Sequence, residues 1–263
     1  MREHRIHSLG ELIDAVTPAE PDPEVGRRRD SGVYHGAPSA SFPLLTSLDR
    51  LGGTDPPHTK AHLEEHILRN FARYSRPHLP SAPATDWELL VIAQHYGVPT
   101  RLLDWSYSPL VAAHFATRKA PRDGDCAIWR LEWHQVHRAF ALPNLALQTQ
   151  DLLTPRLFGS EHALSPWDLF AGRGPSFACL LEPPSLEERI AAQGAVFTLC
   201  SDTSRPFDAF LREHGLEDAL TRFVVPADSV ARLRDQLDLA GIEERRLFPG
   251  LEGVAASIRR YYT

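Results

Sequence analysis

The chain has 263 residues, enough for one large domain or two small ones and for a substantial core that needs no disulfide bonds. Hydrophobic residues make up 43% and charged residues 24% of it, which excludes a disordered, collagen-like or coiled-coil protein. The net charge of −6 argues against a protein that coats nucleic acid with a generally basic surface, but it allows a local basic groove.

The first 30 residues predict a short helix followed by a loop. Within 6–16, Ser8 and Glu11 have the spacing of a capping box at a helix N-terminus. Residues 17–30 are rich in proline and charge, which is typical of a loop. The segment 1–14 lacks the apolar stretch of a signal peptide, and no apolar run approaches the length of a transmembrane helix. We therefore expect a cytoplasmic protein that does not enter membranes.

From residue 31 on, helical and extended patterns alternate irregularly, with long loops between them. This predicts a single α+β domain over 31–263, preceded by the separate segment 1–30. Helices are expected over 59–74, 87–96, 110–118, 229–241 and 251–262. Strands are expected over 32–36, 100–105, 126–132, 194–200 and 220–225. Most of 133–185 has no clear period and predicts no definite element.

Neither the cysteines nor the histidines indicate a metal site. The three cysteines are widely spaced and form no CxxC pair, so they support neither a disulfide framework nor a zinc site. His58, His62 and His66 recur every four residues and would share one helix face, but no HExxH motif accompanies them. We expect no bound metal.

The segment 86–118 concentrates polar and aromatic residues around one strand-to-helix junction. Thr100 and Arg101 begin the predicted strand, and Asp104, Trp105 and Ser106 lie where it meets the next helix. Such a junction places backbone N–H groups and polar side chains at one edge of a sheet, where ligands commonly bind. Two interpretations are open: a ligand site, or a junction at which Asp104 or Ser106 caps the helix and Trp105 fills the core.

The sequence AQHYGVPTRLLDWSYSPLVAAHFA at 93–116 resembles the signature of the FRG domain family, which is named for a Phe/Tyr-Arg-Gly motif. Other family features follow in order along the chain. They are Tyr34-His35-Gly36 with SFPLLTSL at 41–48, CAIWRL at 126–131, ERIAAQGAVFTL at 188–199 and LAGIEERRLFPGLEGVAASIRR at 239–260. The resemblance therefore covers most of the chain. It departs from the family at position 35, where His stands in place of the usual Arg.

The resemblance implies a fold and a site. The family is related by fold to ADP-ribosyltransferases, which cleave NAD, so we expect a split β-sheet core with surrounding helices. Such cores have an Arg or His on an early strand, a polar strand-to-helix junction, and a Glu or Gln on a late strand. In this sequence the matching positions are His35, the junction 104–106 and Gln193.

The resemblance also implies roles toward NAD. The expected catalytic residues are His35, which would bind the adenosine-side ribose, and Gln193, which would bind the nicotinamide-side ribose or the acceptor. Arg101 would face the pyrophosphate, Gly36 would let the backbone approach the nicotinamide amide, and an aromatic ring would stack on nicotinamide. The expected NAD-binding residues are Tyr34, Gly36, Tyr96, Thr100, Arg101, Asp104, Trp105 and Ser106.

Structural alternatives stand beside these roles. Gln193 could satisfy buried backbone groups, and Arg101 could form an ion pair with Asp104 or Asp86. A nearby carboxylate, Glu187 or Glu188, could serve in place of the neutral Gln193.

The leading hypothesis is an ADP-ribosyltransferase that uses NAD as substrate and modifies an unknown acceptor, either a nucleic acid or a protein. Its expected setting, inferred from relatives, is a toxin or phage-defence system with a possible antitoxin or immunity partner. The alternatives are a non-catalytic binding or interaction module with the same fold, and an NAD hydrolase.

Overall fold

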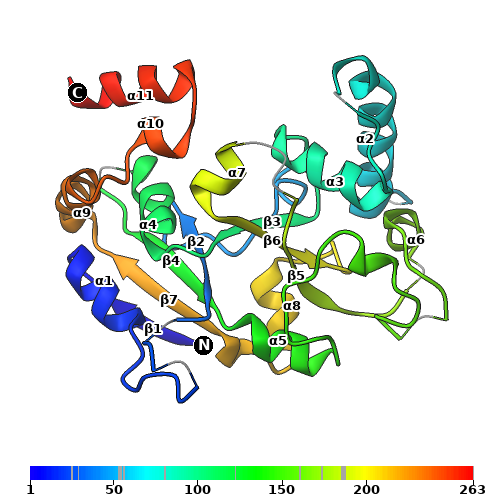
Figure 1. Cartoon of the computed structure of the whole chain (residues 1–263), viewed down its shortest axis with the longest axis horizontal. Helices are drawn as coiled ribbons and strands as arrows, with labels where there is room; N and C mark the ends of the chain where they lie inside the picture. The colour runs from blue at the N-terminus through cyan, green and yellow to red at the C-terminus, as the bar shows by residue number, and fades with distance from the viewer. Residues whose placement is uncertain are drawn as a thin grey trace.

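In the computed structural model, which describes residues 1–24, 26–28, 30–52, 55, 57–79, 81–121, 123–159, 161–172, 174–184 and 188–262, the strands form one open, mixed sheet. Its order within these residues is β1-β7-β4-β2-β3-β6-β5 (Figure 1). The strand β1 runs parallel to β7, and every other neighbouring pair is antiparallel. The strands are β1 (Arg2–Arg5), β2 (Val33–Ala37), β3 (Leu102–Ser106), β4 (Cys126–Leu131), β5 (Ala178–Leu181), β6 (Ala195–Cys200) and β7 (Leu220–Val225).

Helices surround the sheet, so the predicted mixture of helices and strands is confirmed. In the described part of the chain they are α1 (Leu9–Val16), α2 (Lys60–Ser75), α3 (Asp86–His95), α4 (Pro109–Arg118), α5 (Trp133–Ala139), α6 (Pro166–Phe170), α7 (Glu188–Gln193), α8 (Phe207–Glu213), α9 (Ala227–Leu239), α10 (Glu244–Leu247) and α11 (Leu251–Tyr261). None of these helices has the length and apolar character needed to span a bilayer.

Local signals in the sequence explain several helix ends. The Ser8 side chain accepts from the backbone N–H of Glu11 and caps α1, as predicted. The helix α3 ends at His95, and Gly97 follows it with a φ of 78°, a conformation that favours glycine. The strand β1, which pairs with β7 at the sheet edge, was not predicted, and neither were α5, α6 and β5 in the segment without a clear period.

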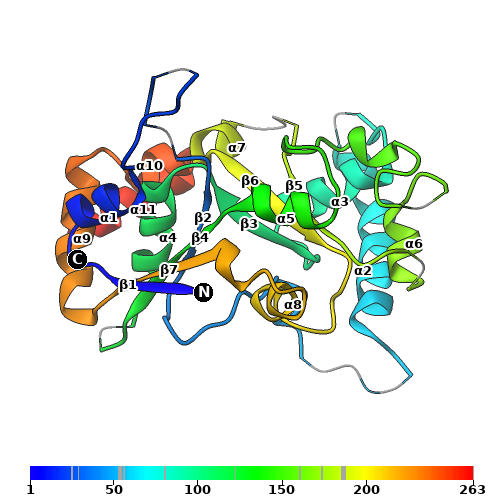
Figure 2. The same cartoon turned by 90° about the horizontal axis from the view of Figure 1, so that it is seen from below.

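Two groups of helices cover the two halves of the sheet (Figures 1 and 2). The first group, α1, α4 and α9, packs on the half that contains β2, β4 and β7. The second group, α2, α3 and α6, shares a core with β3, β5 and β6. A further apolar cluster, with α5 and α8, includes residues of both halves.

The two halves separate between β2 and β3. These strands share a single residue pair, Tyr34 with Ser106, whereas each pairs along its whole length with its other neighbour. The sheet is therefore split at its centre, at the β2–β3 boundary.

The absence of a side chain at Gly36 allows β2 to lie directly on α4. A Cβ at this position would be 2.1 Å from the carbonyl oxygen of Ala112 and 2.5 Å from the backbone nitrogen of Ala116. These are backbone atoms of a helix, which cannot move aside as a flexible side chain can. Gly36 is thus required for strand-to-helix packing.

We predict that Gly36→Ala lowers the free energy of unfolding by about 3 kcal/mol, because β2 and α4 must move apart. The measurement is urea unfolding followed by circular dichroism. The control is Gly10→Ala in α1, where a Cβ meets no atom closer than 3.9 Å and should be neutral or slightly stabilising. Equal stability of the two variants would contradict the packing role.

A buried polar cluster joins α4, α9 and α10. Arg234 donates to Nδ1 of His114 over 3.2 Å and to a carboxylate oxygen of Glu244 over 2.9 Å. All three side chains are buried. Burial, reinforced by the charge of Arg234, lowers the pKa of His114 to about 4. A proton on Nδ1 would also face the N–H donor of Arg234, so the folded protein holds this imidazole neutral.

This cluster predicts acid-sensitive stability. The unfolded chain binds a proton at His114 below about pH 6.5, whereas the folded chain does not until about pH 4, so stability falls as pH is lowered through this window. We expect a loss on the order of 2 kcal/mol, measured by urea unfolding at several pH values. The His114→Gln variant should show a shallower dependence, and an unchanged slope would exclude this residue as the cause.

Candidate functional site

A cavity of about 700 Å³ opens where the sheet splits. Its walls come from β2, β3, the C-terminal end of α3, the helix α4, the helix α7 and Phe248. Its volume lies within the range of small-molecule and cofactor sites. The predicted site residues that line it are His35, Gln193, Tyr34, Gly36, Tyr96, Asp104, Trp105 and Ser106. Three stretches that are far apart in the sequence therefore meet at one cavity.

The His35 side chain bridges the gap between the diverging strands. Its Nδ1 lies 2.7 Å from the backbone carbonyl oxygen of Asp104 on β3. Its ring also makes an edge contact with the buried Trp105, with 5.7 Å between ring centroids. The imidazole thus hydrogen-bonds to a β3 carbonyl with which the β2 backbone does not pair.

This hydrogen bond fixes the chemistry that His35 offers to the cavity. Burial lowers the pKa of the imidazole, and this effect outweighs the hydrogen bond to Asp104. Because a carbonyl oxygen only accepts, the neutral ring carries its proton on Nδ1 and has a lone pair on Nε2. The position that holds Arg in the family therefore presents a hydrogen-bond acceptor here rather than a fork of donors.

Two successive hydrogen bonds, from Thr100 to Gln94 and from Gln94 to Asp104, orient the Asp104 carboxylate. The Thr100 hydroxyl donates to Oε1 of Gln94 over 2.6 Å, and Nε2 of Gln94 donates to Oδ1 of Asp104 over 3.0 Å. Thr100 is fully buried and does not line the cavity. It orients Gln94, which in turn orients the carboxylate.

The rest of the junction is structural. The Trp105 Nε1–H donates to the Thr198 hydroxyl over 3.0 Å, and its ring belongs to the core. The Ser106 hydroxyl donates to the backbone carbonyl of Gln193 over 2.6 Å and accepts from the backbone N–H of Ser108. Ser108, rather than Asp104 or Ser106, caps α4.

Tyr34 and Gly36 present little chemistry to the cavity. The Tyr34 ring is buried against α4 and its hydroxyl donates to the Asp30 carboxylate. Burial and this carboxylate raise the pKa of Tyr34. The side of Gly36 that a Cβ would occupy faces the α4 backbone, and the residue also lines the cavity, so its expected role toward nicotinamide stays a prediction beside the packing role.

Gln193 ends α7 and lies at the cavity wall. Its Nε2 donates to the backbone carbonyl of Leu247 over 2.9 Å, and its own carbonyl accepts from Ser106. The residue therefore connects α7 to α10 and to β3. Because the amide nitrogen is bound to Leu247, the amide oxygen of Gln193 is the side-chain atom available to accept a hydrogen bond from a ligand.

Arg101 lies outside the cavity, and its expected contact with a pyrophosphate is not possible from this position. The side chain is 1% exposed and pairs with Glu64 of α2, with 2.6 Å between Nε and a carboxylate oxygen. It also donates to the carbonyl of Ser201 and lies over the ring of Phe170. The structural interpretation of Arg101 as an ion-pair residue is correct, but the partner is Glu64 and not Asp104 or Asp86.

The cations of the cavity were not predicted. Arg50, Arg118, Lys119 and Arg189 line it, and Asp104 supplies the carboxylate among the lining residues that the structure describes. Arg118 and Arg189 both lie over the Phe248 ring, at 4.5 and 4.9 Å from its centroid. A cationic cavity in an acidic protein favours an anionic ligand. Glu188 is exposed and does not line the cavity, and Glu187 lies outside the described residues.

Of the three histidines, His62 and His66 lie on α2, and His58 precedes this helix. Within the described ranges, no group of three or more His, Cys, Asp or Glu side chains is arranged to hold a metal ion. The ring of His66 instead interacts with the Asn70 side chain over 3.0 Å.

The geometry predicts that His35 is neutral and protonated on Nδ1 at pH 7, because the Asp104 carbonyl accepts from that nitrogen. Long-range ¹H–¹⁵N correlation spectra check this, with His35→Gln identifying the signal among 13 histidines. We expect its titration midpoint below about 6.5. A charged ring at pH 7, or a proton on Nε2, would contradict the arrangement.

Comparisons with known proteins agree with the family resemblance. The FRG domain model matches residues 30–125. No curated protein and no solved structure matched the chain. The matched region contains β2, α3, β3 and α4, and therefore His35 and the junction at Asp104. Over residues 30–125 the chain is thus similar to FRG domains.

Proposed function

We propose that the cavity binds NAD and that the chain transfers ADP-ribose to an acceptor. The observation that carries the proposal is the meeting of His35, Asp104 and Gln193 at one cavity with cationic walls. The split between β2 and β3 supports an ADP-ribosyltransferase-like core, because it opens the sheet at the position where such a core holds its dinucleotide.

The lining residues match the parts of NAD. Arg118 and Arg189 carry guanidinium groups suited to the two charges of the pyrophosphate. The Nε2 lone pair of His35 accepts from a ribose hydroxyl. Tyr96, 60% exposed at the end of α3, offers a ring for stacking on a base or on nicotinamide.

The reaction breaks the glycosidic bond between C1′ of ribose and the nicotinamide nitrogen. Nicotinamide leaves with the bonding electron pair, positive charge develops at C1′, and an acceptor atom attacks C1′ and loses its proton. The Asp104 carboxylate, which Gln94 holds through only one of its oxygens, stabilises the developing positive charge. The amide oxygen of Gln193 accepts from a ribose hydroxyl or from the acceptor.

A specific observation supports a second candidate, a binding module without turnover. Position 193 holds a neutral Gln whose amide nitrogen is committed to the Leu247 carbonyl. No glutamate lines the cavity among the described residues. Both functions require NAD in the same cavity and differ in whether nicotinamide is released.

We predict that the protein binds NAD and releases nicotinamide, and that His35→Ala and Gln193→Ala each lower the release rate more than about tenfold. Calorimetry measures NAD binding, and chromatography measures free nicotinamide. Glu188→Gln is the matched control, because this exposed residue shares α7 with Gln193 but lies outside the cavity. Its rate should equal that of the wild type.

Each result separates the functions. Absence of NAD binding would contradict both candidates, and binding without nicotinamide release would favour the binding module. Release with only free ADP-ribose as the second product would indicate a hydrolase. Equal rates in His35→Ala and the wild type would remove His35 from the site.

A further inference from the structure

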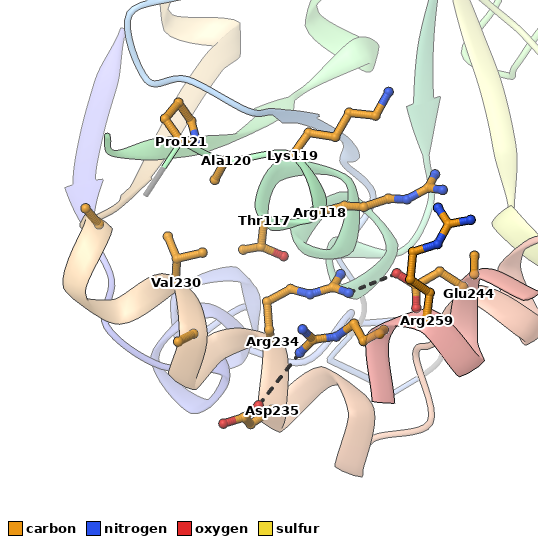
Figure 3. Close-up of a pocket in the computed structure, with 14 residues that line it drawn as sticks. Thr117, Arg118, Lys119, Ala120, Pro121, Val230, Arg234, Asp235, Glu244 and Arg259 are labelled. Carbon is orange, nitrogen blue, oxygen red and sulfur yellow. Dashed lines mark hydrogen bonds and ion pairs between the residues drawn. The ribbon is translucent and has the colours of Figure 1, made fainter. Parts of the chain in front are cut away.

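A second pocket of about 650 Å³ lies beside the main cavity, between the C-terminal end of α4, the helix α9 and the helix α11 (Figure 3). The two hollows share two side chains, Arg118 and Lys119. A ligand in the second pocket can therefore contact Arg118 and Lys119, which also line the main cavity.

The cations of the second pocket fall into two classes. Arg234 is paired with Glu244, and Arg260 is paired with Asp235 and Asp238, so these arginines hold α9, α10 and α11 together. Arg118 and Lys119 form no ion pair with any carboxylate that the structure describes. Arg259, which has an interaction partner of its own, also lines the pocket, and its side chain points toward that of Arg118 (Figure 3).

A basic path therefore connects the two hollows. It begins at Arg189, continues over Phe248 to Arg118 and Lys119, and reaches Arg259 on α11. These cations contrast with the net charge of −6 of the whole chain. A continuous row of cations suits a ligand with repeated negative charges better than a single small anion.

Two exposed aromatic rings lie at the C-terminal end of α11. Tyr261 and Tyr262 directly follow Arg259 and Arg260 in sequence, and they are 83% and 80% exposed. Nothing in the core requires these rings. Cationic grooves flanked by exposed aromatic rings are the features that bind single-stranded nucleic acid, in which phosphates pair with cations and bases stack on rings.

We propose that this path, from Tyr262 through Arg259 and Lys119 to the main cavity, binds a single-stranded nucleic acid. This inference rests on the proposed function in one respect: the bound strand is the acceptor of ADP-ribose. A hydroxyl or base nitrogen of one nucleotide attacks C1′, nicotinamide leaves with the bonding electron pair, and the acceptor atom gives up its proton to solvent. Acidic proteins also fit a basic path, but the exposed rings favour a nucleic acid, whose bases stack on them.

The test uses a fluorescein-labelled 12-nucleotide oligo(dT) and the corresponding oligo(U), with the full chain and no NAD. Fluorescence anisotropy gives the dissociation constant at several salt concentrations. We expect Arg259→Gln combined with Tyr262→Ala to weaken binding at least tenfold. The slope of log K against log salt should become shallower by about 0.7 for the lost phosphate contact.

The matched control is Arg73→Gln combined with Tyr74→Ala. These residues form a similar exposed Arg–Tyr pair at the end of α2, on the other side of the molecule (Figure 1). The control should bind as the wild type does, and thermal unfolding shows that both double variants are folded. No binding, equal loss in both variants, or equal affinity for a duplex of the same sequence would overturn the proposal.

The NAD experiment is independent of this one. The Arg259 and Tyr262 variant keeps the main cavity intact, so its NAD binding should match the wild type. Strand binding without nicotinamide release would remove the transferase function but retain the nucleic-acid site. Nicotinamide release without strand binding, or with modification of an acidic protein only, would retain the enzyme and overturn the inference.

Discussion

The 2.7 Å hydrogen bond between His35 and the Asp104 carbonyl is the interaction on which the site depends. Beyond the pair Tyr34–Ser106, β2 and β3 diverge, and a diverging sheet leaves backbone groups without their ladder partners. A side chain compensates at this boundary, because the imidazole of His35 hydrogen-bonds to the Asp104 carbonyl. The Ser106 hydroxyl in addition ties β3 to the end of α7 through the Gln193 carbonyl. The group that repairs the split therefore also lines the cavity. This is why a substitution at position 35 changes both the sheet boundary and the chemistry of the site.

The helix α4 connects the fold to the electrostatics of the site. Gly36 lets β2 lie against the α4 backbone, and this contact fixes where the C-terminal end of the helix points. That end carries Arg118 and Lys119, where positive charge is also favoured by the helix dipole. The Phe248 ring packs against both Arg118 and Arg189 without neutralising either charge. The position of the cationic wall is thus a consequence of strand-to-helix packing.

Sequence patterns predicted the site residues that lie within recognisable motifs. They did not predict contacts between residues that are far apart in the chain. His35, Asp104 and Gln193 could be placed because each belongs to a recognisable segment. Arg101 belongs to the same motif as Asp104, yet it is buried against Glu64, which lies 37 residues earlier on α2. The alternation of side chains along the strand could have indicated that Arg101 and Asp104 point in opposite directions. Arg101, Leu103 and Trp105 share one face of the strand, and Asp104 lies on the other. Arg118 and Arg189 acquire their role only through Phe248, and no local pattern connects these three residues.

The shared cations set a constraint on any two ligands that use both hollows. Arg118 and Lys119 line the main cavity and the second pocket, so their charge cannot be counted fully toward two polyanions at once. Under the proposed function, the pyrophosphate of NAD and the phosphates of the strand would compete for these groups, while Arg259 lines the second pocket alone and serves only the strand. Nicotinamide leaves as a neutral molecule, its positive charge passes to C1′, and that charge is lost from the site only when the acceptor atom attacks and gives up its proton. Transfer of the ADP-ribosyl group would then create a product that carries additional phosphates on the same cations, and mutual repulsion would favour its release.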